Sequence, residues 1–313
     1  MLSYVMRRVI ATVPVVVMVA VVVFALLRLT PGDPAAMLAG DEATPERLAQ
    51  IRQNMGLDKP IATQFLIWGG NLLQGNLGES LLSGTPVTGM IAGRIGPTFA
   101  LAACTILFTL MVAIPLGVLA AARRGKWVDR GVMTCSVLGF SVPSFVIGYL
   151  LIYLLAMKLG WLPVQGYRPM AQGFWPFMQR LIMPTLALSG LYIALVARIT
   201  RSSLIDVMGE DFVRTARAKG ARETSVLLRH GLRNAAIPIV TIVGIGVAGL
   251  ITGVVVTESV FNLPGLGRLV VEAVLARDYP VIQGLIMFFS LIYITINLLV
   301  DLLYTVFDPR IRY

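Results

Sequence analysis

Long uncharged hydrophobic stretches alternate with short polar or basic segments along almost the whole chain. Each stretch is about as long as an α-helix must be to cross a hydrocarbon core of roughly 30 Å, although the fourth is short and is expected to extend past Arg180 or Arg198. The pattern therefore predicts six membrane-spanning helices, with both termini on the same side of the membrane. The predicted spans are residues 9–27, 95–122, 131–157, 181–197, 234–257 and 279–300.

Composition supports a membrane protein and excludes an ordinary soluble domain. The chain is 57% hydrophobic and 13% charged, with a mean hydropathy of +0.82, whereas charged residues make up about 25% of a typical soluble domain. The first hydrophobic run follows Arg7 and Arg8 but is too long for the apolar part of a typical secretory signal. We therefore expect a retained helix there.

The net charge of +10 indicates orientation in the membrane rather than a nucleic-acid partner. If both termini are cytoplasmic, most lysines and arginines lie in cytoplasmic segments, whereas the external cations are nearly balanced by acids. An excess of cations in the loops that flank membrane spans marks the cytoplasmic side. We therefore expect a multi-pass protein with both termini in the cytoplasm.

The basic segment 201–238 lies between two predicted spans and has the pattern of a short helix with a defined end. Glu210 and Asp211 are suited to open this helix and Arg217 and Lys219 to close it, because acids are favoured at a helix N-terminus and cations at its C-terminus. Gly220 supplies the left-handed residue that commonly follows a helix. The simpler alternative is a solvated basic loop attracted to the lipid surface.

A second amphipathic turn is expected beyond this glycine elbow. Thr224 is its candidate N-cap, and Pro238 begins the next apolar run. The apolar face of the turn consists of Val226, Leu228 and Leu232. The segment is therefore predicted to form a helix, an elbow and a second helix at a membrane surface.

Several sequence blocks, in the same order, resemble the permease subunits of binding-protein-dependent ABC importers. The version they resemble is that of dipeptide and oligopeptide permeases, to which glutathione and nickel importer permeases are similar. In the cytoplasmic loop often called the EAA loop, this chain has Arg214-Thr215-Ala216 in place of Glu-Ala-Ala, and Gly220 stands at the glycine position. The blocks are LTPGDPAAMLAG, MGLDKPIATQF, GVLAAARRGKWVDR, RTARAKG, LRNAAIP, TESVFNLPGLGRLV, RDYPVIQ and NLLVDLLYTVFDPRIRY.

The resemblance implies an all-α membrane protein with six transmembrane helices of the type I ABC importer permease kind. Residues 1–29 would hold the cytoplasmic start and first helix, 30–94 a long extracytoplasmic segment, and 95–313 a five-helix core that includes the cytoplasmic coupling loop 201–238. The segment 30–94 would contact a substrate-binding protein or cover the pathway mouth. A structural cap on the external helix ends is the alternative.

The resemblance also implies partners, a cargo and a site. The partners would be a second homologous permease subunit, two ATPase subunits and an extracytoplasmic substrate-binding protein, in a bacterial inner membrane. The cargo would be a small peptide, namely a dipeptide, an oligopeptide or glutathione. The expected ATPase-coupling residues are Glu210, Asp211, Arg214, Thr215, Ala216, Arg217, Ala218, Lys219 and Gly220.

Small residues in the third and fifth predicted spans suggest either a transport pathway or close helix packing. Gly249 and Gly253 have the spacing that lets helix backbones approach, because lipid supplies no hydrophobic drive for helix association. Pro143 either marks a kink or lies in the pathway. The full candidate set is Ser141, Pro143, Ser144, Gly244, Gly246, Gly249 and Gly253.

The chain lacks the sequence signals of an enzyme. Gly125-Lys126 is followed by Trp127 and belongs to no phosphate-binding loop, so ATP and Mg²⁺ are expected in partner subunits and no cofactor in this chain. Cys104, Cys135 and His230 are too scattered for a metal site. One alternative function is a secondary transporter that couples a proton gradient through Asp301 or Glu258. No internal repeat supports it.

Overall fold

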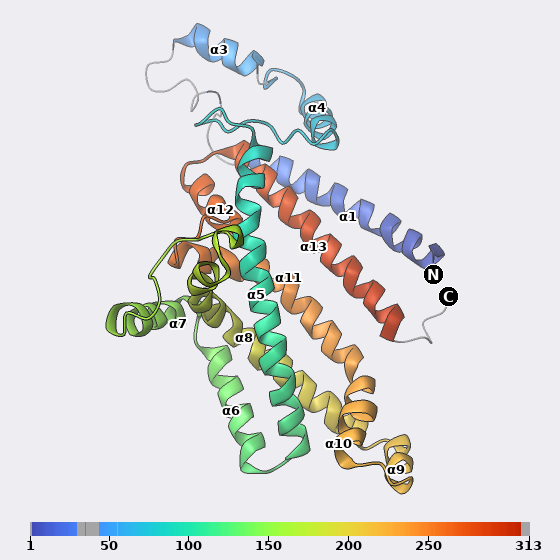
Figure 1. Ribbon diagram of the computed structural model, residues 1–313. Helices are drawn as coiled ribbons and strands as arrows, with labels where there is room; N and C mark the ends of the chain where they lie inside the picture. Colours follow the sequence, from blue (N-terminus) through green and yellow to red (C-terminus); the bar gives the residue numbers. More distant parts are fainter. Residues whose placement is uncertain (1, 30–34, 36–43, 55, 308–313) are drawn as a thin grey trace. The chain divides into compact units, whose positions relative to one another are not determined.

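Figure 1 shows a computed structural model of the chain, which describes residues 2–29, 35, 44–54 and 56–307. In these ranges the regular structure is helical, apart from one β-bridge between Glu79 and Pro86. The elements are α1 (Leu2–Leu29), α3 (Pro45–Asn54), α4 (Ile61–Leu73), α5 (Val87–Ala122), α6 (Trp127–Ser141), α7 (Ser144–Leu151), η1 (Ile152–Lys158), η2 (Met170–Gln172), α8 (Phe174–Met208), α9 (Asp211–Ala218), α10 (Glu223–Ser225), η3 (Val226–Leu232), α11 (Ala236–Val260), α12 (Leu266–Leu275) and α13 (Tyr279–Phe307).

The prediction of an all-α multi-pass membrane protein is confirmed. Among the described residues, four helical stretches are long and apolar enough to cross a membrane, or up to six if each of two bent helix pairs counts as one span. The fourth span does extend past both flanking arginines, as the short hydrophobic run requires. The four stretches are Met6–Ala25, Val87–Ala122, Phe174–Val207 and Tyr279–Leu302, and the bent pairs are Trp127–Ser141 with Ser144–Lys158 and Glu223–Leu232 with Ala236–Ile251.

The third predicted span is not one straight helix. Its two parts meet at an angle of 96°, and the break falls at Val142-Pro143. Val142 is extended, with φ −96° and ψ 121°, because the ring of a following proline disfavours the helical conformation. Pro143 therefore marks a kink, which was one of the two roles considered for it.

The chain divides into two compact units. The first contains Gly96–Arg268 and the last part of α13, and the second contains the described part of Leu2–Ile95 together with Leu269–Ile294. In the first unit α8 packs against α6, α7 and α11. Its apolar core includes Leu181 and Leu188 of α8, Leu250 of α11, and Phe261.

Helices in the first unit approach one another through small residues. The position of a Cβ on Gly139 of α6 is 3.2 Å from the carbonyl oxygen of Gly190 in α8, and one on Gly117 of α5 is 2.6 Å from Thr200 Cβ. A Cβ would be a tight contact at Gly139 and would overlap Thr200 at Gly117. Close backbone approach is the usual basis of helix association where lipid supplies no hydrophobic drive.

The carboxylate of Glu258, near the end of α11, is fully buried and joins three helices. It accepts a hydrogen bond from the Thr98 hydroxyl of α5 at 2.6 Å and one from the Arg268 N–H of α12 at 3.0 Å. The Thr98 oxygen in turn accepts the Leu266 N–H at 2.8 Å. An acid is favoured at a helix N-terminus by the unpaired N–H groups and the helix dipole, so Glu258 binds the start of α12 to α5 and α11.

Two glycines make this arrangement possible. A Cβ on Gly265 would overlap the Glu258 carboxylate, and one on Gly267 would lie 2.5 Å from the Val255 Cα. The second contact is with backbone, which cannot rotate away. These close approaches explain why the block TESVFNLPGLGRLV has two glycines within three residues.

In the second unit, the described part of segment 30–94 is tied to the ends of α12 and α13. Asp278 accepts hydrogen bonds from the Ser80 hydroxyl and, at 3.1 Å, from the Leu81 N–H. Arg94 and Glu272 form an ion pair at 2.7 Å. These contacts attach the described part of the segment to α12 and to the turn before α13. Residues 30–34, 36–43 and 55 of the predicted extracytoplasmic segment, and 308–313 of the predicted cytoplasmic end, lie outside the described residues.

We predict that Gly267→Ala lowers the stability of the protein by roughly 1–3 kcal/mol, because the added methyl group forces the α11 and α12 backbones apart. The matched control is Gly131→Ala in α6, where no atom lies within 4 Å of the new Cβ and alanine favours the helix. The measurement is the melting temperature of each purified protein in the same detergent. Equal melting temperatures for Gly267→Ala and the unmutated protein would contradict the packing described for α12.

Candidate functional site

The segment between α8 and α11 contains the predicted helix and elbow. Helix α9 runs from Asp211 to Ala218, with Glu210 at the N-cap position. Gly220 has φ +80°, and its N–H donates to the Arg217 carbonyl at 2.9 Å while the N–H of the next residue donates to the Ala216 carbonyl at 3.2 Å. This pair of hydrogen bonds is the Schellman motif, which requires a left-handed residue after the helix. Glycine is therefore the favoured residue at position 220, because it adopts the left-handed conformation without strain.

The prediction that Thr224 caps the second helix is wrong. Helix α10 begins at Glu223, and its N-cap is Arg222, two residues before Thr224 and in an extended conformation. Glu223 lies in the first turn, where an acid is favoured. It also forms an ion pair across the elbow, in which Arg217 Nε donates to Glu223 Oε1 at 2.7 Å and Arg217 Nη2 donates to Oε2 at 3.3 Å. This contact raises the pKa of Arg217 above its ordinary value, so the guanidinium stays charged.

Eight of the nine predicted coupling residues are exposed, and Ala216 is partly buried. The Arg217–Glu223 pair connects α9 to α10, and Arg214 pairs with Asp211 within α9 at 3.2 Å. Exposed pairs of this kind contribute little stability. The surface of α9 therefore presents charged groups together with Phe212, whose side chain is 43% exposed. Sequence reasoning did not single out Phe212, although its place beside Asp211 in an amphipathic helix is a signal.

The opposite face of the segment is packed onto the end of α8. Val213 of α9 and Val226 of η3 are fully buried. A Cβ on Gly231 of η3 would lie 2.7 Å from Leu204 Cδ1 and 3.2 Å from Met208 Sδ, both in α8. Figure 1 shows α9 and α10 near the start of α11, where the chain returns toward the spans. We refer to α9, α10 and η3 together as the coupling segment. This segment is in close contact with the end of α8.

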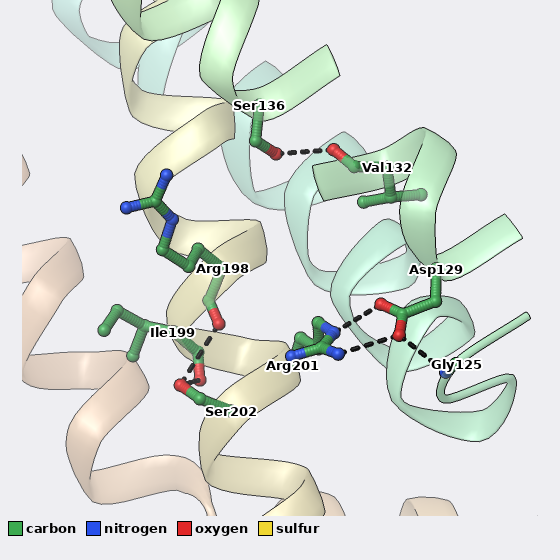
Figure 2. Close-up of polar contacts among 8 residues, drawn as sticks. All are labelled: Gly125, Asp129, Val132, Ser136, Arg198, Ile199, Arg201 and Ser202. Carbon is green, nitrogen blue, oxygen red and sulfur yellow. Dashed lines mark hydrogen bonds and ion pairs between the residues drawn. The ribbon is translucent and has the colours of Figure 1, made fainter. Parts of the chain in front are cut away.

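An ion pair between a buried aspartate and a partly exposed arginine joins α6 to α8 (Figure 2). The Asp129 side chain, in the first turn of α6, is 4% exposed and pairs with Arg201 of α8. Arg201 Nη2 donates to Asp129 Oδ2 at 2.7 Å, Nε donates to Oδ1, and the Gly125 N–H donates to Oδ2 at 2.8 Å. The sequence identified both charges only as cytoplasmic, because nothing local connects residues so far apart along the chain.

The candidate pathway residues are distributed over several contacts. Pro143, Ser144 and Gly253 line a cavity of about 140 Å³ at the break between α6 and α7, with Leu188 and Tyr192 of α8 on the same wall. The other candidates do not line it: Ser141 is exposed and donates to the Val137 carbonyl, Gly244 meets Val300 of α13, and Gly246 and Gly249 meet the Tyr192 side chain.

The two carboxylates considered for proton coupling lie in different surroundings. Glu258 is fully buried among hydrogen-bond donors at the start of α12, whereas Asp301 is partly buried in α13. These hydrogen bonds give Glu258 a structural role at the start of α12. In the described part of the chain, no group of three or more His, Cys, Asp or Glu side chains is suited to a metal ion.

Comparison with known proteins gives two family matches. Residues 113–313 match the family described as binding-protein-dependent transport system inner membrane component. Residues 1–102 match the family described as binding-protein-dependent transport system membrane component, N-terminal. Together the matches cover most of the chain.

Individual relatives agree along the full length. The chain is 50% identical over 310 residues to the probable peptide ABC transporter permease protein y4tP of Sinorhizobium fredii, covering 99% of each chain. It is 46% identical over 313 residues to the glutathione transport system permease protein GsiC of Pectobacterium atrosepticum, covering 100% of each.

A solved structure of the MetNI methionine ABC transporter in an inward-facing conformation has a similar fold. The TM-score is 0.58 at 16% identity, over 70% of this chain and 96% of that one. At this identity the likeness shows the fold alone. Combined with the sequence matches, it confirms the resemblance inferred from the sequence blocks: this chain belongs to the family of inner-membrane permease components of binding-protein-dependent ABC transport systems.

Proposed function

We propose that this chain is the permease subunit that admits small peptides through the bacterial inner membrane, with energy supplied by separate ATPase subunits. The observation that carries the proposal is the 50% identity, over 99% of both chains, to a probable peptide ABC transporter permease. The relative named for glutathione transport places a modified tripeptide in the same cargo class. Dipeptides, oligopeptides and glutathione are therefore the cargoes to test.

The family implies assembly with ATPase subunits and a substrate-binding protein. We further propose two ATPase subunits and a second, homologous permease, with both termini in the cytoplasm and the segment 30–94 outside. The excess of cations in the segments assigned to the cytoplasm supports this orientation. ATP and Mg²⁺ would bind the ATPase subunits only.

The exposed face of α9 is proposed as the ATPase docking surface. Its charged residues and Phe212 face outward, while Val213 faces the protein interior. Because η3 packs directly on α8, a displacement of α9 by a closing ATPase pair is passed to the spans. In this scheme the transport complex has two conformational states. Nucleotide drives transport only because it binds these two states with different affinity.

The proposed role of the elbow predicts that Gly220→Val lowers peptide uptake while the complex still assembles. A β-branched residue at φ +80° costs about 1 kcal/mol or more and redirects α10 relative to α9. Gly220→Asn is the matched control, because asparagine tolerates left-handed backbone, and it should retain most uptake. Uptake and the amount of assembled complex are measured in the same membranes. Wild-type uptake by Gly220→Val would show that the elbow does not matter for coupling.

The energy source is tested by reconstituting the complete complex in liposomes, with ATP and no proton gradient and then with the gradient and no ATP. We expect accumulation of a labelled dipeptide only with ATP. Asp301→Asn keeps hydrogen-bonding capacity and should reduce uptake modestly, whereas Arg214→Glu combined with Arg217→Glu should reduce it strongly, because the double change reverses two charges on α9. Accumulation that follows the gradient, ignores ATP and disappears in Asp301→Asn would establish a secondary transporter instead.

A further inference from the structure

The Asp129–Arg201 pair is geometrically specific. The two nitrogens of the Arg201 fork contact the two oxygens of the Asp129 carboxylate, and the Gly125 N–H donates to the oxygen that also accepts Arg201 Nη2. A planar fork held by two contacts fixes both the distance and the rotation between its partners. Figure 2 shows the carboxylate held between the turn that precedes α6 and the side of α8. The pair therefore sets one register of α6 along α8.

Stability alone is a weak reason for such a pair. Removing two charges from water costs about as much as their attraction returns, so an apolar pair of similar size often stabilises a protein equally well. Elsewhere along the same two helices, Gly139 meets the backbone of Gly190. A contact between small residues allows close approach but does not by itself prevent one helix from sliding on another. The ion pair supplies the directional contact that this packing lacks.

The pair lies between the coupling segment and the cavity at the break of α6. Arg201 is about one helical turn from Leu204, the α8 residue against which Gly231 of η3 packs. At its other end, α6 leads to the wall of the 140 Å³ cavity formed by Pro143, Ser144 and residues of α8. A slip of α6 along α8 would change that wall without moving the coupling segment.

We propose that Asp129 and Arg201 are positioning residues for transport, which lock α6 to α8 so that the α6–α7 break follows the coupling segment through the ATP cycle. The lock rests on the proposed function, since it acts on the step from ATPase movement to pathway movement. Without the Asp129–Arg201 pair, ATP hydrolysis continues, but the cavity wall at the α6–α7 break no longer moves with the coupling segment.

The decisive variant is Asp129→Leu combined with Arg201→Met. It leaves no lone buried charge, so it should assemble with the partner subunits and melt close to the wild-type temperature. It also removes the directional contact. In liposomes with the complete complex, ATP and a labelled dipeptide, we expect near-normal ATP hydrolysis and a fall of about five-fold or more in peptide taken up per ATP, the lower end of typical coupling between sites.

Two further variants provide an intermediate case and a control for the peptide taken up per ATP. Arg201→Lys keeps the charge but replaces the fork by a single ammonium group, so uptake per ATP should fall between the double variant and the wild type. Arg130→Gln is the matched control: it removes an exposed charge from the same turn of α6 and should leave uptake per ATP unchanged.

The outcomes separate the proposals. An assembled double variant with wild-type uptake per ATP overturns the lock, and so does failure of that variant to assemble, because the pair would then serve folding. Parallel losses of ATP hydrolysis and uptake, at a lowered melting temperature, also contradict it. Absence of ATP-driven uptake by the wild-type complex would instead overturn the proposed function itself.

Discussion

Helices inside a bilayer gain no hydrophobic free energy by leaving lipid for one another, and the first unit of this protein is organised around that constraint. Its helices are held by close backbone approach, as at Gly139 with Gly190, and by buried carboxylates that accept hydrogen bonds from neighbouring helices. A carboxylate left without donors there would be very costly. Asp129 joins α6 to α8, and Glu258 joins α12 to α5 and α11.

The two carboxylates act on different parts of the unit. Glu258 gathers the start of α12 against α5 and α11, and the space for it depends on Gly265. Asp129 joins α6 to α8 beside the coupling segment, which itself packs on α8 through η3. The segment that faces the proposed ATPases is thereby in continuous contact with the helices that border the α6–α7 cavity. This continuity is what a permease driven from one side of the membrane requires.

Local patterns were predictable from the sequence, and long-range contacts were not. The spans follow from length and hydropathy, and α9 with its left-handed Gly220 follows from charge placement and the conformational freedom of glycine. Thr224 was misplaced because Glu223, an acid favoured in the first turn of a helix, begins α10 and pairs across the elbow with Arg217. The Asp129–Arg201 pair escaped notice because its partners are 72 positions apart. Glu258 was one of two carboxylates considered for proton coupling. Its hydrogen-bond donors, in α5 and α12, could not be identified from the sequence because they become its neighbours only in the fold.

The central claim is that the coupling segment, α8 and α6 move as one body. The most direct measurement is the distance between spin labels at Arg130→Cys in α6 and Arg229→Cys in η3, two exposed positions outside the proposed docking surface, with Cys104 and Cys135 replaced. Pulsed electron spin resonance would be recorded on the complete complex without nucleotide and with ATP trapped before hydrolysis. If the three move as one body, the distance distribution is the same in both states. A shift of the distribution on ATP binding, in a labelled complex that still transports peptide, would show that α6 and the coupling segment move separately.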